Sequence, residues 1–300
     1  MRYLLLGGSG FIGSYLANSL ARENQVVVVG RQPKCDFESK NIEYRQMDFV
    51  KCDDFTDYIK DVDIIVHMIS TIIPSEDTSK FNLEINENVL PTIRLLEDAS
   101  RLKKKVVFIS SGGAIYGEND NKNKESSPTN PICNYGIIKL MIEKYLALYH
   151  EYYGLEYRII RPSNPYSETV YHNKKQGIIP VIVENLIKGE PMSVYGGEQI
   201  RDYIYIDDLV DGISAVLEYA GEQRIFNIGT GEGCTVEAII KMAEKKTGRK
   251  LKVKLLPMRK CDVVKNILDI SLIKEETGWT PKISLESGLD KIIEREIAYV

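Results

Sequence analysis

The chain has 300 residues and a formal net charge of −4, with 43% hydrophobic and 27% charged residues. That balance is typical of a soluble globular protein long enough for one large domain or two ordinary ones. The acidic charge argues against general nucleic-acid binding, which needs a basic face. The apolar start is too short and glycine-rich for a membrane span, and five cysteines without a CxxC pair favour a reduced, cytoplasmic setting.

Short apolar segments alternate with helical segments from the first residue onward. Six segments are predicted as strands: 3–6, 26–29, 42–48, 63–69, 105–110 and 155–162. Helices are expected at 53–60, 84–102 and 135–154. Because fully apolar, β-branched strands between helices are typical of a parallel sheet covered on both faces, the sequence predicts a doubly wound α/β fold.

Proline and glycine become frequent after Arg161, which indicates a second, smaller region. A strand and helix near 203–220 are expected to return to the first sheet, so this region is not contiguous. The predicted first domain comprises 1–162 with about 203–224, and the second region comprises about 163–202 with 225–300.

The segment "LLLGGSGFIGSYL" places Gly7, Gly10 and Gly13 between the first strand and the first helix. Glycines at this spacing make a tight turn, admit a pyrophosphate close to the backbone and let the helix pack on the sheet. A purely structural turn is the alternative. The position after a strand and before an apolar-faced helix predicts a dinucleotide site.

No carboxylate follows the second predicted strand, where dinucleotide sites usually hold the ribose diol. Gly30 and Arg31 stand there instead. An arginine would suit a 2′-phosphate and hence NADP, whereas the alternative is an exposed arginine stacked near the adenine. Asp48, at the end of the third strand, is expected to bind the adenine amino group.

Tyr135 and Lys139 in "NYGIIKL" share one face of a predicted helix. A tyrosine has an ordinary pKa near 10, and an adjacent ammonium stabilises the phenolate that could act as a base. A second pair at the same spacing, Tyr171 and Lys175, lies in a polar, loop-like stretch where helical alignment is not expected.

Three scattered histidines predict no metal cluster, and His67 is expected in the core. Asp207 and Asp208 in "IDDLVDG" are interpreted as the start of a helix rather than as paired catalytic carboxylates.

These motifs together resemble the extended short-chain dehydrogenase/reductase superfamily, and within it the UDP-glucose 4-epimerase-like nucleotide-sugar epimerases. The resemblance covers essentially the whole chain and rests on "GGSGFIG", "MDF", "ENVLPT", "SSGGAIYG", "NYGIIK", "RPSNPYS", "RDYIYIDDLVDG", "NIGTGEG" and "MRKCD". It implies a Rossmann-type fold, tightly held NAD, a nucleoside-diphosphate sugar, and a homodimer formed through the helices expected at 84–102 and 135–154.

The resemblance also implies roles for individual residues. Tyr135 would deprotonate the sugar 4-hydroxyl while hydride passes to the cofactor, and the hydride's return to the other face of the 4-keto sugar would invert C4. Lys139 would hold the nicotinamide ribose and lower the pKa of Tyr135. The matching cofactor residues are Gly7, Gly10, Phe11, Ile12, Gly13, Arg31, Asp48, Phe49, Asn88 and Lys139, and the matching substrate residues are Asn164, Arg201, Arg259 and Asp262.

The segment "FISSGGAIYG" lacks the hydroxyl that the family places four residues before its "VYG" tyrosine, since Gly112 stands there. Our hypothesis is that Ser111 replaces it. One step along a regular strand reverses a side chain, but this strand is ending and Gly112-Gly113 permit unusual φ. The rival interpretation is that Tyr135 acts directly, with water in the space left by Gly112.

Gly112-Gly113-Ala114 also replaces the Thr-Asp-Glu of sugar-nucleotide dehydratases, which argues against water elimination. Asn266 stands at the family position that gates the sugar pocket, and its medium size predicts room for an N-acetylated sugar.

Two alternative functions follow from the same residues. The absence of a carboxylate at Gly30-Arg31 supports an NADP-dependent nucleotide-sugar reductase or dehydrogenase. A non-catalytic dinucleotide-sensing regulator on the same fold is disfavoured because Tyr135 and Lys139 are both present.

Overall fold

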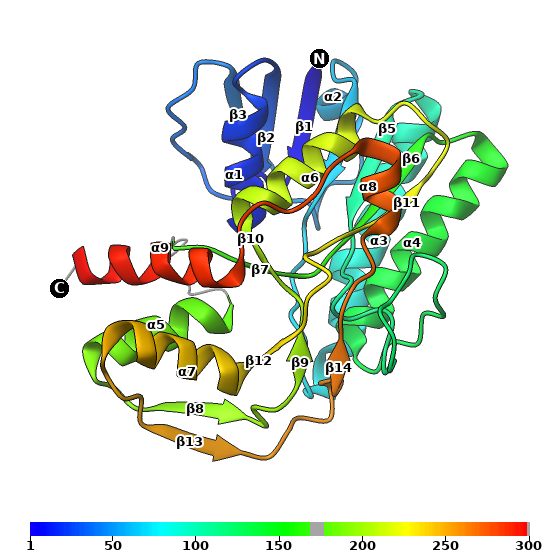
Figure 1. Ribbon diagram of the computed structural model, residues 1–300. Helices are drawn as coiled ribbons and strands as arrows, with labels where there is room; N and C mark the ends of the chain where they lie inside the picture. Colours follow the sequence, from blue (N-terminus) through cyan, green and yellow to red (C-terminus); the bar gives the residue numbers. More distant parts are fainter. Residues whose placement is uncertain (169–176, 299–300) are drawn as a thin grey trace.

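A seven-stranded parallel sheet forms the centre of the computed structural model, which describes residues 1–168 and 177–298 (Figure 1). The strand order is β11-β6-β5-β4-β1-β2-β3, so the direction of winding reverses between β1 and β4. Ligands of such sheets bind at the carboxyl ends of the strands beside that reversal. The strands are β1 (Arg2–Leu6), β2 (Gln25–Gly30), β3 (Ile42–Gln46), β4 (Ile64–His67), β5 (Lys105–Ile109), β6 (Tyr157–Pro162) and β11 (Ile225–Ile228).

The first strand shows why the sheet is apolar throughout. Tyr3 and Leu5 point into one buried cluster, and Leu4 and Leu6 point into another on the opposite face. Successive side chains of a strand alternate between faces, so a sheet buried on both sides needs apolar residues at every position. The predicted doubly wound fold is confirmed.

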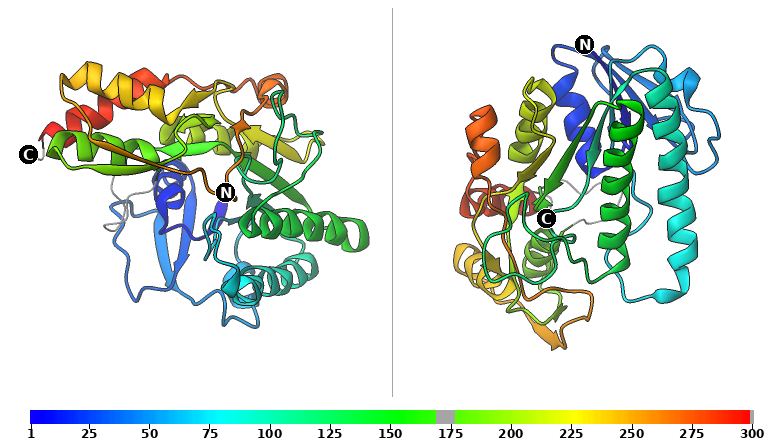
Figure 2. Two further views of the ribbon diagram at one scale, coloured as in Figure 1. Left: turned by 90° about the horizontal axis from the view of Figure 1, so that it is seen from below. Right: turned by 90° about the vertical axis from the view of Figure 1, so that its right-hand side faces the viewer.

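Helices cover both faces of the sheet. α1 (Phe11–Leu20) and α6 (Ile206–Glu218) pack against each other on one face, whereas α2 (Thr56–Ile59), α3 (Phe81–Arg101) and α4 (Asn134–Tyr153) contribute to the opposite core. Figure 2 shows α3 and α4 side by side along their length. None of the helices in the described ranges has both the length and the apolar character needed to cross a bilayer.

A second region, which we call the C-terminal lobe, lies beside the sheet in Figure 1. Its helices α5, α7 and α9 contact one another, and β8 pairs with β13. The lobe and its connections comprise β7 (Asn164–Tyr166), α5 (Ile178–Lys188), β8 (Met192–Tyr195), β9 (Ile200–Arg201), β10 (Tyr203–Tyr205), β12 (Cys234–Thr235), α7 (Val236–Thr247), β13 (Val253–Leu256), β14 (Lys265–Asn266), α8 (Ser271–Thr277) and α9 (Leu285–Ala298), while η1 (Thr78–Lys80) precedes α3.

Two strands differ from the predicted division of the chain. β10, expected in the large sheet, pairs with β7 instead; it is three residues long and leads directly into α6. β11, expected in the second region, is an edge strand of the large sheet beside β6. Its side chains Phe226 and Ile228 are fully buried there, which explains the pairing.

Candidate active site

Two adjoining cavities lie where the carboxyl ends of the strands meet the C-terminal lobe. The inner cavity, about 380 Å³, is lined by the glycine turn after β1 together with Ser111, Tyr135 and Lys139. The outer cavity, about 480 Å³, is lined mainly by residues of the lobe. Both are within the size range of small-molecule sites. They share Pro74, Asn164 and Pro165 in their linings.

The glycine turn is shaped by close approach of the backbone. Gly7 has a φ of +84°, and a Cβ on Gly13 would lie 2.3 Å from the Gly7 carbonyl oxygen, so neither position tolerates a side chain. Gly10 precedes α1 and makes no side-chain cap, which leaves the first amides of the helix for another acceptor. Phe11 and Ile12 also line the inner cavity. This arrangement fits the pyrophosphate of a dinucleotide.

The residues at the end of β2 explain the missing carboxylate. A Cβ on Gly30 would lie 2.8 Å from Ser9 Oγ and 2.9 Å from Tyr44 Oη, so these two hydroxyls occupy the space of a side chain. Arg31 is exposed, and its carbonyl accepts a hydrogen bond from Gln46 Nε2. A carboxylate therefore could not stand at position 30 without displacing its neighbours.

Four of the predicted cofactor residues do not line the inner cavity: Arg31, Asp48, Phe49 and Asn88. Asp48 accepts a hydrogen bond from the Val50 amide, and Phe49 is buried. Asn88 is also buried, and its side chain bonds the Thr71 amide and hydroxyl. Asn88 thus holds the loop after β4, whose Ser70 and Ile72 do line the cavity.

Tyr135 and Lys139 lie one turn apart near the start of α4, and both line the inner cavity. Lys139 Nζ donates to the Ile109 carbonyl at 2.9 Å and lies 5.8 Å from the centre of the Tyr135 ring. Burial lowers the pKa of Lys139 to about 8, and the negative charge of Glu143 acts in the opposite direction. The ammonium group of Lys139 is thus buried beside the Tyr135 ring.

The pKa of Tyr135 differs from the expectation. Burial raises it, and the hydrogen bond that acts in the opposite direction comes from the Ser111 side chain. The expected lowering of the Tyr135 pKa by Lys139 is not the main effect, because the phenol is buried and desolvation disfavours its charged form. Ser111 therefore lines the same cavity as Tyr135, and its side chain is the group that lowers the pKa of the phenol against the effect of burial.

Gly112 faces away from Tyr135. A Cβ on Gly112 would lie 2.7 Å from Leu268 Cδ1 and 2.9 Å from the Arg161 carbonyl oxygen. Asn266 Nδ2 donates to the Gly112 carbonyl at 3.1 Å. The space beside Gly112 is thus filled by Leu268, and a hydroxyl at this position would point to the C-terminal segment. This geometry favours the Ser111 hypothesis over water beside Gly112.

The outer cavity is lined by the four residues to which the resemblance assigns substrate contacts: Asn164, Arg201, Arg259 and Asp262. Arg259 pairs with Asp262 through two hydrogen bonds of 2.8 Å, and its guanidinium lies 5.7 Å from the ring centre of Tyr195. Two arginines near one another suit a diphosphate, because each guanidinium can donate two parallel hydrogen bonds.

Sequence reasoning missed two residues here: Tyr195, which lines the outer cavity, and Asp202, which follows Arg201 but does not line that cavity. Tyr195 offers an aromatic face to a base, but a tyrosine in a short β segment gives no distinctive signal. Asp202 is fully buried and accepts hydrogen bonds from the Thr230 amide, the Thr230 hydroxyl and the Gly231 amide. An aspartate between Arg201 and the apolar run of β10 was the signal that could have indicated a buried anchor.

Asn266 is buried in β14 and does not line either cavity. Its side chain donates to the Gly112 carbonyl, and its backbone pairs with Arg201 of β9. Any influence of Asn266 on the sugar therefore acts by way of the Gly112 turn or of β9 rather than by contact in this geometry.

The remaining candidates have structural environments. His67 is buried against Thr92, and burial lowers its pKa to about 3, so it is neutral. Asp208 accepts from the amides of Lys282 and Ile283. Within residues 1–168 and 177–298, no three His, Cys, Asp or Glu side chains are grouped as a metal site. The Tyr171–Lys175 pair lies outside the described residues.

Comparison with known proteins places this geometry among related chains. The model of the NAD dependent epimerase/dehydratase family matches residues 3–229. A dTDP-4-dehydro-6-deoxyglucose reductase from Escherichia coli is 31% identical over 97% of this chain and 96% of its own length. A UDP-glucose 4-epimerase from Mycolicibacterium smegmatis is 30% identical, covering 98% of each. The crystal structure of the Thermotoga maritima UDP-glucose 4-epimerase with UDP-glucose superposes with a TM-score of 0.88 at 31% identity, covering 100% of this chain and 99% of that one.

Proposed function

The chain belongs to the NAD dependent epimerase/dehydratase family, and from this premise we propose that it is a nucleotide-sugar 4-epimerase with bound NAD. The observation that carries the proposal is the meeting of Ser111, Tyr135 and Lys139 on the wall of the inner cavity, beside an outer cavity with two arginines. The named epimerase relatives support it.

NAD would accept hydride from C4 of the sugar and return it to the opposite face. Tyr135 would take the proton of the 4-hydroxyl, and Ser111, on the wall of the same cavity, would orient that hydroxyl. Lys139 would hold the nicotinamide ribose and keep positive charge beside the phenolate. The glycine turn and the uncapped start of α1 would hold the pyrophosphate of the cofactor.

Inversion requires the 4-keto sugar to turn while its nucleotide stays bound. Arg201, Arg259 and Asn164 would hold the diphosphate, and Asp262 would orient Arg259. Binding energy at the diphosphate would retain the intermediate while leaving the sugar ring free to rotate.

A nucleotide-sugar reductase is the second candidate, because Gly30 leaves no place for a carboxylate that would repel a 2′-phosphate and because the Escherichia coli relative is a reductase. A reductase would exchange its cofactor after each turnover. An epimerase would reuse the same cofactor.

The exposed apolar side chains of α3 and α4 support a homodimer. Leu83 and Leu90 on α3, with Ile137 and Leu148 on α4, expose apolar surface on two helices that lie side by side. We propose that a second copy of the chain covers them, as the family resemblance implies.

The test uses the purified protein without added cofactor. Incubation with UDP-glucose, UDP-galactose and their N-acetyl counterparts, followed by separation of the products, should give C4 epimers. Denaturation of the same preparation should release NAD in nearly equimolar amount. Conversion that occurs only with added NADPH or NADP, in stoichiometric amount, would replace the proposal with the reductase. A preference for the N-acetyl sugars would support the predicted room for an N-acetylated sugar, which Asn266 would influence without lining the cavities.

A further inference from the structure

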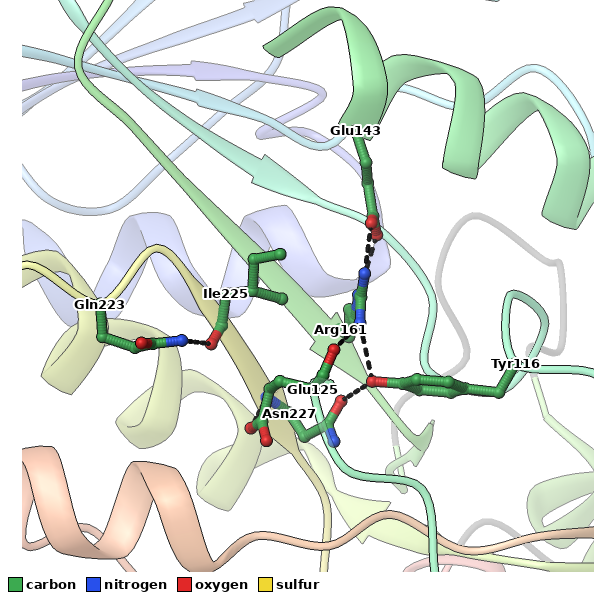
Figure 3. A network of polar contacts seen from close by, with 7 residues as sticks. All are labelled: Tyr116, Glu125, Glu143, Arg161, Gln223, Ile225 and Asn227. Atoms are coloured by element: carbon green, nitrogen blue, oxygen red, sulfur yellow. Dashed lines mark hydrogen bonds and ion pairs between the residues drawn. The ribbon is translucent and has the colours of Figure 1, made fainter. Parts of the chain in front are cut away.

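A buried polar network lies close to the inner cavity, but none of its side chains is part of the cavity lining. The Arg161 guanidinium donates to both carboxylate oxygens of Glu143, at 3.1 and 2.6 Å, and to the Tyr116 hydroxyl at 2.9 Å (Figure 3). The Tyr116 hydroxyl donates to Asn227 Oδ1 at 2.7 Å. All four side chains are buried. We call this set the Arg161 network.

The Arg161 network is attached to the segment that carries Ser111. On β6, the carbonyls on either side of Arg161 accept hydrogen bonds from that segment: Ile160 from the Ser110 amide, and Pro162 from the Gly112 amide, each at 2.8 Å. Arg161 also holds Tyr116, at the far end of the same turn. The position of Ser111 is therefore fixed to the strand on which Arg161 stands.

The network is also attached to the helix that carries Tyr135. Glu143 lies one turn after Lys139 and two turns after Tyr135 on α4. Its bidentate pairing with Arg161 fixes the distance between β6 and this helix. The planar guanidinium of Arg161 thus connects the segment that carries Ser111 to the helix that carries Tyr135.

The serine turn needs an external anchor. Gly112 and Gly113 follow Ser111 directly, and a glycine pair restricts the backbone less than any other residues would. Replacing a buried ion pair with apolar residues is often neutral or stabilising, so stability alone does not account for this pair. A role in fixing the geometry of the serine turn accounts for the ion pair.

We infer that Glu143, Arg161 and Tyr116 are positioning residues that hold the Ser111 hydroxyl against Tyr135. This inference rests on the proposed epimerase reaction. None of the three lines either cavity. Their effect on Ser111 runs through the two supports they join, and the charge of Glu143 also acts on the pKa of Lys139.

The test compares three variants by epimerisation kinetics across pH. Tyr116→Phe removes one hydroxyl of the network and keeps the ring. Its matched control is Tyr157→Phe, a buried tyrosine on β6 whose hydroxyl is not part of the network. The Glu143→Leu/Arg161→Met double variant removes the ion pair without leaving an isolated charge. Unfolding midpoints report whether each variant is folded.

Tyr116→Phe and the double variant should lower kcat about 10- to 100-fold through misalignment, while KM for the nucleotide sugar changes less than about twofold. The acid limb of the kcat profile should move to higher pH, because a weaker Ser111 contact leaves the pKa of Tyr135 higher. Tyr157→Phe should keep the wild-type kcat and profile.

A double-mutant cycle separates positioning from a general structural effect. In a Ser111→Ala background, Tyr116→Phe should lower kcat no further, because its effect runs through the missing hydroxyl. Additive losses, or an unchanged kcat and pH profile in folded Tyr116→Phe, would overturn the inference while leaving the epimerase proposal intact. Absence of epimerisation by the wild-type protein would overturn the proposed function itself.

Discussion

Leu268 occupies the space that a side chain on Gly112 would need, since a Cβ there would lie 2.7 Å from Leu268 Cδ1. The hydroxyl that the family resemblance led us to expect at this position is therefore absent for a steric reason. The neighbouring hydroxyl is that of Ser111, on the other side of the backbone.

Gly112→Ser should lower the free energy of unfolding by about 1–3 kcal/mol, because it overpacks this contact. Adding Leu268→Ala should recover part of that loss by opening space. The hydroxyl at position 112 should not restore activity to Ser111→Ala, since it points toward the C-terminal segment. Urea unfolding measures the change in stability, and epimerisation rates measure whether activity is restored. Restored activity would show that the turn can present either position to the tyrosine.

Ser111→Ala should lower kcat by about 10- to 100-fold, with less effect on KM, because it removes the group that we propose orients a proton transfer. Initial rates with a saturating nucleotide sugar measure this. Ser127→Ala, a serine on the polar loop whose hydroxyl accepts from the Lys124 amide, is a control at a distance from the cavities. Full turnover by Ser111→Ala would favour direct action of Tyr135.

Tyr135→Phe should lower kcat by about 10²- to 10⁴-fold, the range of general acid–base catalysis. Binding of the nucleotide sugar should change little, because the diphosphate contacts proposed in the outer cavity remain. Isothermal titration and rate measurements separate the two. Tyr152→Phe on the same helix, where the residue is 69% exposed, should behave as wild type. Retained catalysis by Tyr135→Phe would remove the tyrosine from the mechanism.

Lys139→Met should inactivate the enzyme and also stabilise it, by roughly 1–3 kcal/mol at pH 7. Burial holds the pKa of Lys139 at about 8 in the folded chain, below the ~10.4 of an unfolded lysine. Between these values the unfolded chain binds the extra proton, so wild-type stability should rise with pH, and below pH 8 the penalty is constant.

Urea unfolding between pH 7 and 10 tests this sign, because Lys139→Met should lose the rise. Lys144→Met, on the exposed side of α4, should retain it. A less stable Lys139→Met protein would mean that the hydrogen bond to Ile109 outweighs the burial of the charge.

Leu148→Glu should convert a dimer into monomers, because it places a charge in the apolar surface that α3 and α4 expose. Light scattering after size exclusion measures the mass. Ile297→Glu on α9, an exposed apolar residue on a different surface, should leave the mass unchanged. A wild-type protein that is monomeric at all concentrations would contradict the proposed interface.

Periodicity and motif spacing were sufficient to predict the first six strands of the sheet and the positions of Tyr135 and Lys139. They were insufficient for β11, because a four-residue apolar segment does not specify its partner, and burial of Phe226 against other elements decides it. They also did not predict the direction in which a side chain at position 112 would point. That direction depends on Leu268, a residue distant in sequence whose contact no local pattern encodes.

The cover that Leu268 and Asn266 place over Gly112 comes from near the end of the chain, whereas Ser111, Tyr135 and Lys139 belong to its first half. Synthesis therefore produces the reactive groups long before the segment that closes over their supporting turn. A nascent chain that has reached β11 holds every strand of the large sheet and all three groups, yet lacks this cover. Full activity should consequently appear late in translation, and chains released before residue 268 should be inactive even where the sheet has formed.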